Sequence, residues 1–121
     1  DRRPFSMDAA KLFNLSQQGK VKVYVSAVSY NNIYYILRQS LSNNETIKLL
    51  SELSEMTEMA DVTKGIIRKS IKTEFKDFED AIQYNCALNL GRIDCIVTRD
   101  TKDFRRSEIP VMTPHEAVSL F

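Results

Sequence analysis

The chain has 121 residues, of which 43% are hydrophobic and 27% charged, a composition that is ordinary for one globular domain. Seventeen Lys and Arg against sixteen Asp and Glu leave a formal charge of +1, so any contact with a polyanion must come from local clusters. No apolar run approaches the roughly 20 residues that a membrane span needs. Cys86 and Cys95 lie in no metal-binding spacing. We therefore expect a soluble, cytoplasmic domain with reduced cysteines and no membrane partner.

Helical and strand-like patterns alternate along the chain. In chain order we predict a helix over 5–18, a strand over 21–26, a helix over 30–41, a helix over 47–53, a weak strand over 56–62, helices over 63–72 and 77–90, strands over 95–98 and 109–112, and a helix from 113. Gly19 and Gly91 end two of the helices. This alternation predicts a single α/β domain over 1–121, with a short, mainly parallel central sheet flanked by helices.

Several segments carry finer expectations. The continuous apolar run over 95–98 is typical of a strand buried on both faces, and Pro110 indicates an edge strand. The aromatic run over 30–35 favours core packing and a contribution to a dimer face. The final helix should begin with Thr113 as cap and Glu116 completing a capping box. That context makes His115, the only histidine, an ordinary surface residue and disfavours Ser-His or Cys-His catalysis.

Acidic residues gather at the start of the predicted helix over 77–90. Asp77 and Asp80 share one helix face, whereas Glu79 is rotated away from them. Acids in a first helical turn complement the helix dipole and Asp77 is a natural N-cap, so a structural role is the more frequent one for Asp77 and Glu79. Asp80 borders the apolar side of the helix, where a carboxylate is costly unless a cation or a donor meets it. Asp80 is therefore the stronger functional candidate.

A second group of acids follows the predicted strand over 95–98. Asp100 and Asp103 come directly after that strand, and ligands of open α/β sheets bind beyond the carboxyl ends of the strands. The alternative is that Asp100 is a turn residue that bonds its own backbone. If both acids face Asp80, the three carboxylates supply the oxygen ligands that Mg²⁺ prefers. Nearby cations would suit a phosphodiester substrate, namely Arg99, Lys102, Arg105 and Arg106.

Four motifs in this order give the chain a specific resemblance. They are YVSAVSYNNIYYILR, DFEDAIQYNCA, IDCIVTRDTKDF and IPVMTP. Over essentially its whole length the chain resembles the PIN-domain family, and in particular the bacterial branch of VapC-like toxins. The resemblance implies a three-layer α/β/α fold and a ribonuclease that uses Mg²⁺ or Mn²⁺ to cleave RNA. It also implies an antitoxin protein and a homodimer as candidate partners.

Matched position by position, the resemblance assigns the catalytic and metal-binding roles to Asp80, Asp100 and Asp103. It gives supporting roles to Asn32, Thr98, Asp77 and Glu79, and RNA contacts to Arg99, Lys102 and Arg105. Asn32 takes the place of a Glu ligand that is usual in the family, and an amide binds a metal ion more weakly than a carboxylate does. We therefore expect weaker metal binding than is usual in the family.

A second departure concerns the beginning of the chain. The family carries its first acid on a strand ahead of the first helix, whereas this sequence begins with Asp1-Arg2-Arg3-Pro4 and no apolar strand. We expect such a strand upstream, and poor activity without it. The alternative is a catalytically degenerate PIN-like domain that binds RNA or protein. A receiver-like phosphoacceptor domain is less favoured, because no acid pair closes a first strand.

Overall fold

The structure, a computed structural model, describes residues 3–121, with side chains from residue 7 onward. The elements in order are α1 (Arg3–Gln17), β1 (Tyr24–Ser26), α2 (Ala27–Leu37), α3 (Asn43–Met56), β2 (Glu58–Ala60), α4 (Lys64–Lys72), α5 (Phe78–Leu90), β3 (Ile96–Val97), the 3₁₀ helix η1 (Thr101–Phe104), β4 (Val111–Met112) and α6 (Pro114–Val118). Each predicted helix and strand has a counterpart in this order.

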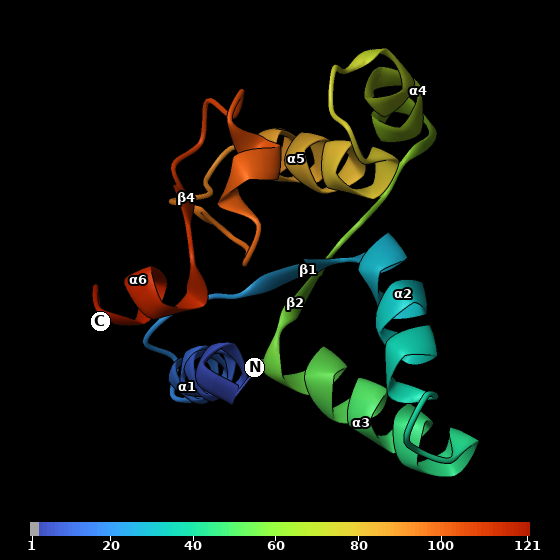
Figure 1. Ribbon diagram of the computed structural model, residues 1–121, viewed down its shortest axis with the longest axis vertical. Coiled ribbons are helices and arrows are strands. Elements are labelled where there is room, and N and C mark those ends of the chain that lie inside the picture. The colour runs from blue at the N-terminus through green and yellow to red at the C-terminus, as the bar shows by residue number, and fades with distance from the viewer. Residues whose placement is uncertain (1–2) are drawn as a thin grey trace.

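The elements form the three layers of an α/β/α fold, as the sequence predicts. In Figure 1, α4 and α5 lie on one side of the strands, and α1, α3 and α6 lie on the other side. The strands are short, and both strand pairs are parallel. They pair in two ladders, β1 with β2 (Tyr24 opposite Glu58) and β3 with β4 (Ile96 opposite Val111). Parallel pairing brings the carboxyl ends of both strands of a ladder to the same edge.

Local capping explains where the helices begin and end. Each of five helices begins after a side chain that accepts a hydrogen bond from the backbone of its first turn, namely Ser26, Ser42, Thr63, Asp77 and Thr113. The capping box predicted for Thr113 and Glu116 is present. Gly91 ends α5 with φ +72°, a left-handed conformation that glycine adopts at little cost. These predictions are confirmed.

Other expectations are corrected by the structure. The strand predicted over 95–98 is not buried on both faces: Val97 is 42% exposed, because within the described chain β3 pairs with β4 alone and remains an edge. Core packing of the aromatic run over 30–35 is also wrong in part. Tyr35 is 63% exposed and no residue of α2 is fully buried, since α2 contacts β1 and α3 along one side. The helix predicted to reach Leu41 ends at Leu37.

The core holds α5 against α4 and β2. Ala60, Ile66, Ile82 and Cys86 form its buried cluster. Buried Asn85 adds polar links across the same interface, donating from its amide to the hydroxyl oxygens of Ser70 and Thr73 at 3.0 and 3.2 Å. Because α5 is fixed in this way, the position of its acidic first turn is fixed as well.

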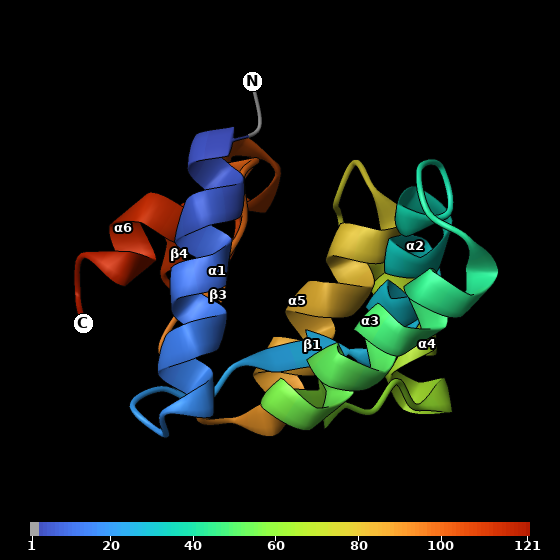
Figure 2. The same cartoon turned by 90° about the horizontal axis from the view of Figure 1, so that it is seen from below.

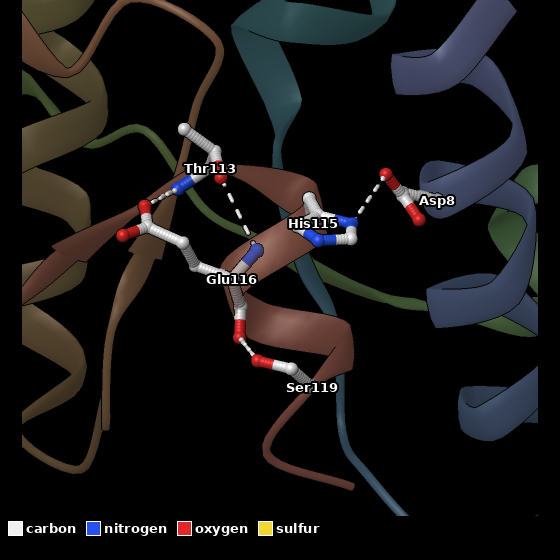
Figure 3. Close-up of polar contacts among 5 residues, drawn as sticks. All are labelled: Asp8, Thr113, His115, Glu116 and Ser119. Atoms are coloured by element: carbon white, nitrogen blue, oxygen red, sulfur yellow. Dashed lines mark hydrogen bonds and ion pairs between the residues drawn. The ribbon is translucent and has the colours of Figure 1, made fainter.

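The packing of α1 against α6 gives His115 a partner that the sequence did not reveal. The two helices lie side by side (Figure 2). The His115 side chain is 81% exposed, as expected of a surface residue, yet its Nδ1 lies 3.4 Å from Oδ2 of Asp8, which is buried (Figure 3). His115 therefore helps to accommodate a buried carboxylate. None of the helices that the structure describes is long and apolar enough to cross a membrane.

Candidate acidic site and cationic cleft

Asp80 lies in the first turn of α5, next to the residue that caps the helix. The Asp80 backbone N–H donates to Oδ1 of Asp77 at 3.0 Å. The structural interpretation of Asp77 as N-cap is thus confirmed. The cap holds the Asp77 carboxylate within one helical turn of Asp80, so the same hydrogen bond that starts the helix also brings two negative charges together.

The pKa of Asp80 reflects the burial of this side chain and the other carboxylates near it. It is raised from 3.8 to about 6, first by burial and then by repulsion from Asp77, Asp103, Glu79 and Asp100. Repulsion of this kind requires the charges to lie near one another, within the reach of weakly screened Coulomb forces. The structure therefore gathers acids from α5 and from the segment after β3 into one neighbourhood. We call Asp77, Glu79, Asp80, Asp100 and Asp103 the acidic cluster.

The end of β3 positions the second half of the cluster. The Thr98 N–H donates to the Met112 carbonyl at 2.9 Å, which extends the β3–β4 ladder to Thr98. The Thr98 hydroxyl oxygen then accepts from the Asp100 N–H at 3.1 Å, and the Asp100 carbonyl accepts from the Asp103 N–H at 3.0 Å. Thr98 thus fixes the backbone of the turn that carries both acids. The Asp100 side chain caps nothing in η1, so the alternative of a self-bonded turn aspartate gains no support there.

Glu79 is held by amides from two helices. Its Oε2 accepts from Nδ2 of Asn32 at 3.3 Å and from Nε2 of Gln83 at 3.0 Å. Gln83 also donates to the Ser29 hydroxyl, which exchanges a hydrogen bond with Ser26 at the end of β1. The network connects α2 to the acidic end of α5 and places Asn32 beside the cluster. Gln83 and Ser29 were missed from the sequence, although Gln83 stands one turn after Glu79.

The donor set of the acidic cluster fits a hard divalent cation. Carboxylate oxygens are the ligands that Mg²⁺ and Mn²⁺ prefer, and a bound cation would relieve the repulsion that raises the Asp80 pKa. Among the residues whose side chains the structure describes, no three acid, His or Cys side chains are grouped closely enough to hold a metal ion. The acids thus share a neighbourhood rather than a closed coordination shell.

A cleft with a volume of about 540 Å³ adjoins the cluster at Asp103. It lies between the chain around Phe75 and the η1 region, and its lining consists of Glu74, Phe75, Lys76, Lys102, Asp103, Arg105 and Arg106. The lining includes Lys102 and Arg105, two of the three predicted RNA contacts. Arg99 is exposed and lies outside the lining. We call this feature the cationic cleft.

The cleft lining also includes Lys76, which was not predicted to contact RNA, and Arg106, one of the cations that suit a phosphodiester. Lys76 stands directly before the cap of α5, and Arg106 belongs to the same run of cations as Arg105. Arg106 forms an ion pair with Glu74 across the cleft lining. The basic run was visible in the sequence, but the approach of 74–76 to it depends on tertiary structure.

Comparison with known protein families gives a match. The family model described as PIN domain matches residues 1–102. The chain belongs to the PIN-domain family. PIN domains are generally nucleases that bind nucleic acid and typically use a divalent metal. Neither the curated proteins nor the solved structures include a significant match to this PIN domain.

Proposed function

We propose that this PIN domain is a ribonuclease that hydrolyses RNA phosphodiester bonds with Mg²⁺ or Mn²⁺ bound by Asp80, Asp100 and Asp103. The observation that supports it most is the match of residues 1–102 to the PIN domain, a family whose members are generally nucleases. The pKa of Asp80, which burial and four neighbouring carboxylates raise at the edge of a cationic cleft, adds to this support. Strongly perturbed acids in such a setting are typical of functional sites. When bound, the cation lowers the pKa of water and neutralises charge that develops on the phosphate.

The remaining residues of the site would bind and orient. Lys102 and Arg105 line the cleft that Asp103 shares, so they can hold phosphate oxygens next to the acids. Arg99 would contact the RNA outside the cleft. Asn32 positions Glu79 through its amide, and Thr98 positions Asp100 through its hydroxyl. Asp103 belongs to both the acidic cluster and the cleft lining, which makes it the junction between metal binding and RNA binding.

The finer assignment follows the VapC-like resemblance. We propose that the protein acts as the toxin of a toxin–antitoxin pair, with an antitoxin protein as its partner and a homodimer as its assembly. Exposed apolar side chains on α2 and α3 support a protein contact, among them Tyr35, Ile36 and Ile47. Pulldown of the chain with the product of a neighbouring reading frame would test the partner. Sedimentation would test the dimer.

An RNA-cleavage assay tests the nuclease directly. The full chain is incubated with single-stranded RNA and Mg²⁺ or Mn²⁺, and separately with a chelator. We expect cleavage that requires the cation and falls at least about 100-fold in Asp80→Ala, since a metal ligand supports the chemical step itself. Glu52→Ala, an exposed α3 substitution, is the matched control and should cleave normally. Equal cleavage by Asp80→Ala and the unmutated protein would end the assignment.

The rival is a degenerate PIN domain that binds RNA or protein without cleaving. Asn32 in place of a carboxylate favours it, because an amide adds no charge to a metal site. Binding of RNA with no cleavage under any divalent cation, together with no thermal stabilisation by Mn²⁺, would establish this rival.

A further inference from the structure

We propose that the cationic cleft holds one unpaired nucleotide of the RNA strand beside the cleavage position, and that Glu74 competes with its phosphate for Arg106. This inference rests on the proposed function for the identity of the polymer. The residues to which it assigns new roles, however, are separate from the acids that would carry out hydrolysis, although Asp103 also lines the cleft. It assigns roles to Lys76, Phe75 and Glu74 that neither the family match nor the motifs assign. It also gives Arg106, already among the cations suited to a phosphodiester, a competing partner in Glu74.

The charge of the cleft is the first argument. Four cations line it against two acids, although the whole chain carries a charge of only +1. Lys76 belongs to the segment before α5, whereas Lys102, Arg105 and Arg106 belong to η1 and the turn that follows. A phosphate between these segments would meet cations on two sides. Local charge of this kind supplies most of the affinity of a protein for nucleic acid.

The second argument is an aromatic side chain in the lining of the cleft. Phe75 lines the cleft and is only partly buried. The centroid of its ring lies 5.3 Å from that of Tyr84 and 5.5 Å from that of Phe104, so two buried rings pack against it. A packed, partly exposed aromatic ring among cations is the combination on which unpaired bases stack. A base inside a duplex is already stacked and cannot reach such a ring, so the cleft favours a single strand.

The third argument is the size and the position of the cleft. Its volume of about 540 Å³ falls within the range of roughly 300–1,000 Å³ that is usual for ligand pockets. Asp103 stands in its lining and is one of the acids that raise the pKa of Asp80. A strand that occupies the cleft would therefore continue directly into the acidic cluster.

Glu74 would compete with an RNA phosphate for Arg106. Its carboxylate pairs with the Arg106 guanidinium, and the two side chains are 77% and 72% exposed. An exposed ion pair contributes little to stability, so exchange of Glu74 for a phosphate is inexpensive. A phosphate can accept two hydrogen bonds from one guanidinium. Removal of the Glu74 charge should thus strengthen RNA binding, whereas removal of the Arg106 charge should weaken it.

The test measures binding apart from cleavage. A short fluorescent single-stranded RNA is titrated with the full-chain Asp80→Asn variant, alone or combined with Lys76→Gln, Arg106→Gln, Glu74→Gln or, as control, Lys48→Gln on exposed α3. We expect Lys76→Gln and Arg106→Gln to weaken binding about 3- to 10-fold and to reduce the slope of log affinity against log salt by about 0.7 each. Glu74→Gln should tighten binding about 3-fold, and Lys48→Gln should change nothing. A duplex of the same sequence should bind more weakly.

The contrary results are equally definite. Binding that is unchanged by all three cleft substitutions, or equal affinity for single strand and duplex, would overturn the subsite. If the cleft substitutions have no effect while the unmutated protein cleaves RNA, the subsite fails and the nuclease stands. If they change RNA binding as expected while no divalent cation supports cleavage, the subsite stands and the nuclease fails.

Discussion

The charge of Asp80 is controlled by residues from two distant parts of the chain. Asp77 and Glu79 stand at the start of α5 beside it, whereas Asp100 and Asp103 come from the segment after β3. Helix capping explains why Asp77 is there, and the hydroxyl of Thr98 explains the turn that carries Asp100. The pKa of Asp80 therefore depends on the arrangement of the whole acidic cluster.

The raised pKa of Asp80 predicts an inverted pH dependence of stability. The folded protein retains the proton more strongly than the unfolded chain does, so folding is favoured below the unfolded pKa of 3.8 and loses that contribution as pH rises to about 6. Asp80→Asn should therefore raise the thermal midpoint at pH 7.5 by about 2 °C, a small shift because solvent screens much of the repulsion. The measurement is thermal unfolding in chelator across pH. A gap between the two proteins that persisted below pH 3.8 would contradict this cause.

His115 leads to a second prediction at the residue scale. Asp8 is 7% exposed, and Nδ1 of the His115 imidazole lies 3.4 Å from its Oδ2. Replacement of His115 by Ala leaves the buried carboxylate without that partner, at a cost of about 1–2 kcal/mol of unfolding free energy. Urea unfolding of His115→Ala measures this cost. The double variant Asp8→Asn/His115→Ala should recover part of the lost unfolding free energy. If it recovers none, the loss in His115→Ala does not come from the contact with Asp8.

At the scale of elements, the ends of the helices are where local sequence and structure agree best. Asp77, Gly91 and the Thr113–Glu116 box are recognisable from the sequence because each acts within three or four residues. The contact between Asn32 and Glu79 spans 47 residues, and no local pattern encodes it. The exposure of Val97 was likewise hidden, since an apolar run does not reveal how many neighbours its strand will have.

Replacement of Gly91 and of Gly65 by Ala tests whether the backbone conformation at the end of α5 requires glycine. Gly91 has φ +72° and open space around a Cβ atom, so Gly91→Ala meets backbone strain alone and should cost about 1 kcal/mol. Gly65 is helical, and an added Cβ would make ordinary contact with Thr63 Oγ1 at 3.7 Å. Gly65→Ala should leave stability equal or slightly higher. Chemical denaturation compares the two, and an equal loss in both would refute the assignment of strain to Gly91.

The interface between α4 and α5 depends on a buried amide. Asn85 is 2% exposed and donates to hydroxyls of Ser70 and Thr73. Asn85→Ala should destabilise the fold by about 1–3 kcal/mol, because it removes two hydrogen bonds and opens space in the core. Exposed Asn89→Ala on the same helix is the control and should change stability little. Equal unfolding midpoints for the two variants would show that the amide contributes nothing.

For the whole molecule, the sequence predicted the order of elements, the parallel α/β/α fold and the family. The assignment of Asp80, Asp100 and Asp103 as metal ligands stays a prediction, since no three acid, His or Cys side chains among the described residues are grouped closely enough to hold a metal ion. Only part of the cationic cleft could be predicted from the sequence. Lys102 and Arg105 lie in one basic run, but Lys76 joins them through tertiary packing. The sequence also did not show how the strands pair, because two or three residues carry too little pattern to specify a partner strand.

A cation held by the acidic cluster is the central claim, and a Mn²⁺ titration of thermal stability tests it most directly. Binding to the folded state at 100 times the dissociation constant should add about 2.7 kcal/mol, seen as a rise of several degrees in the midpoint. The account predicts this rise for the unmutated chain and for the control Glu52→Gln, and a much smaller rise for Asp80→Asn and Asp103→Asn. Equal rises in all four proteins, or no rise in the unmutated chain, would contradict it.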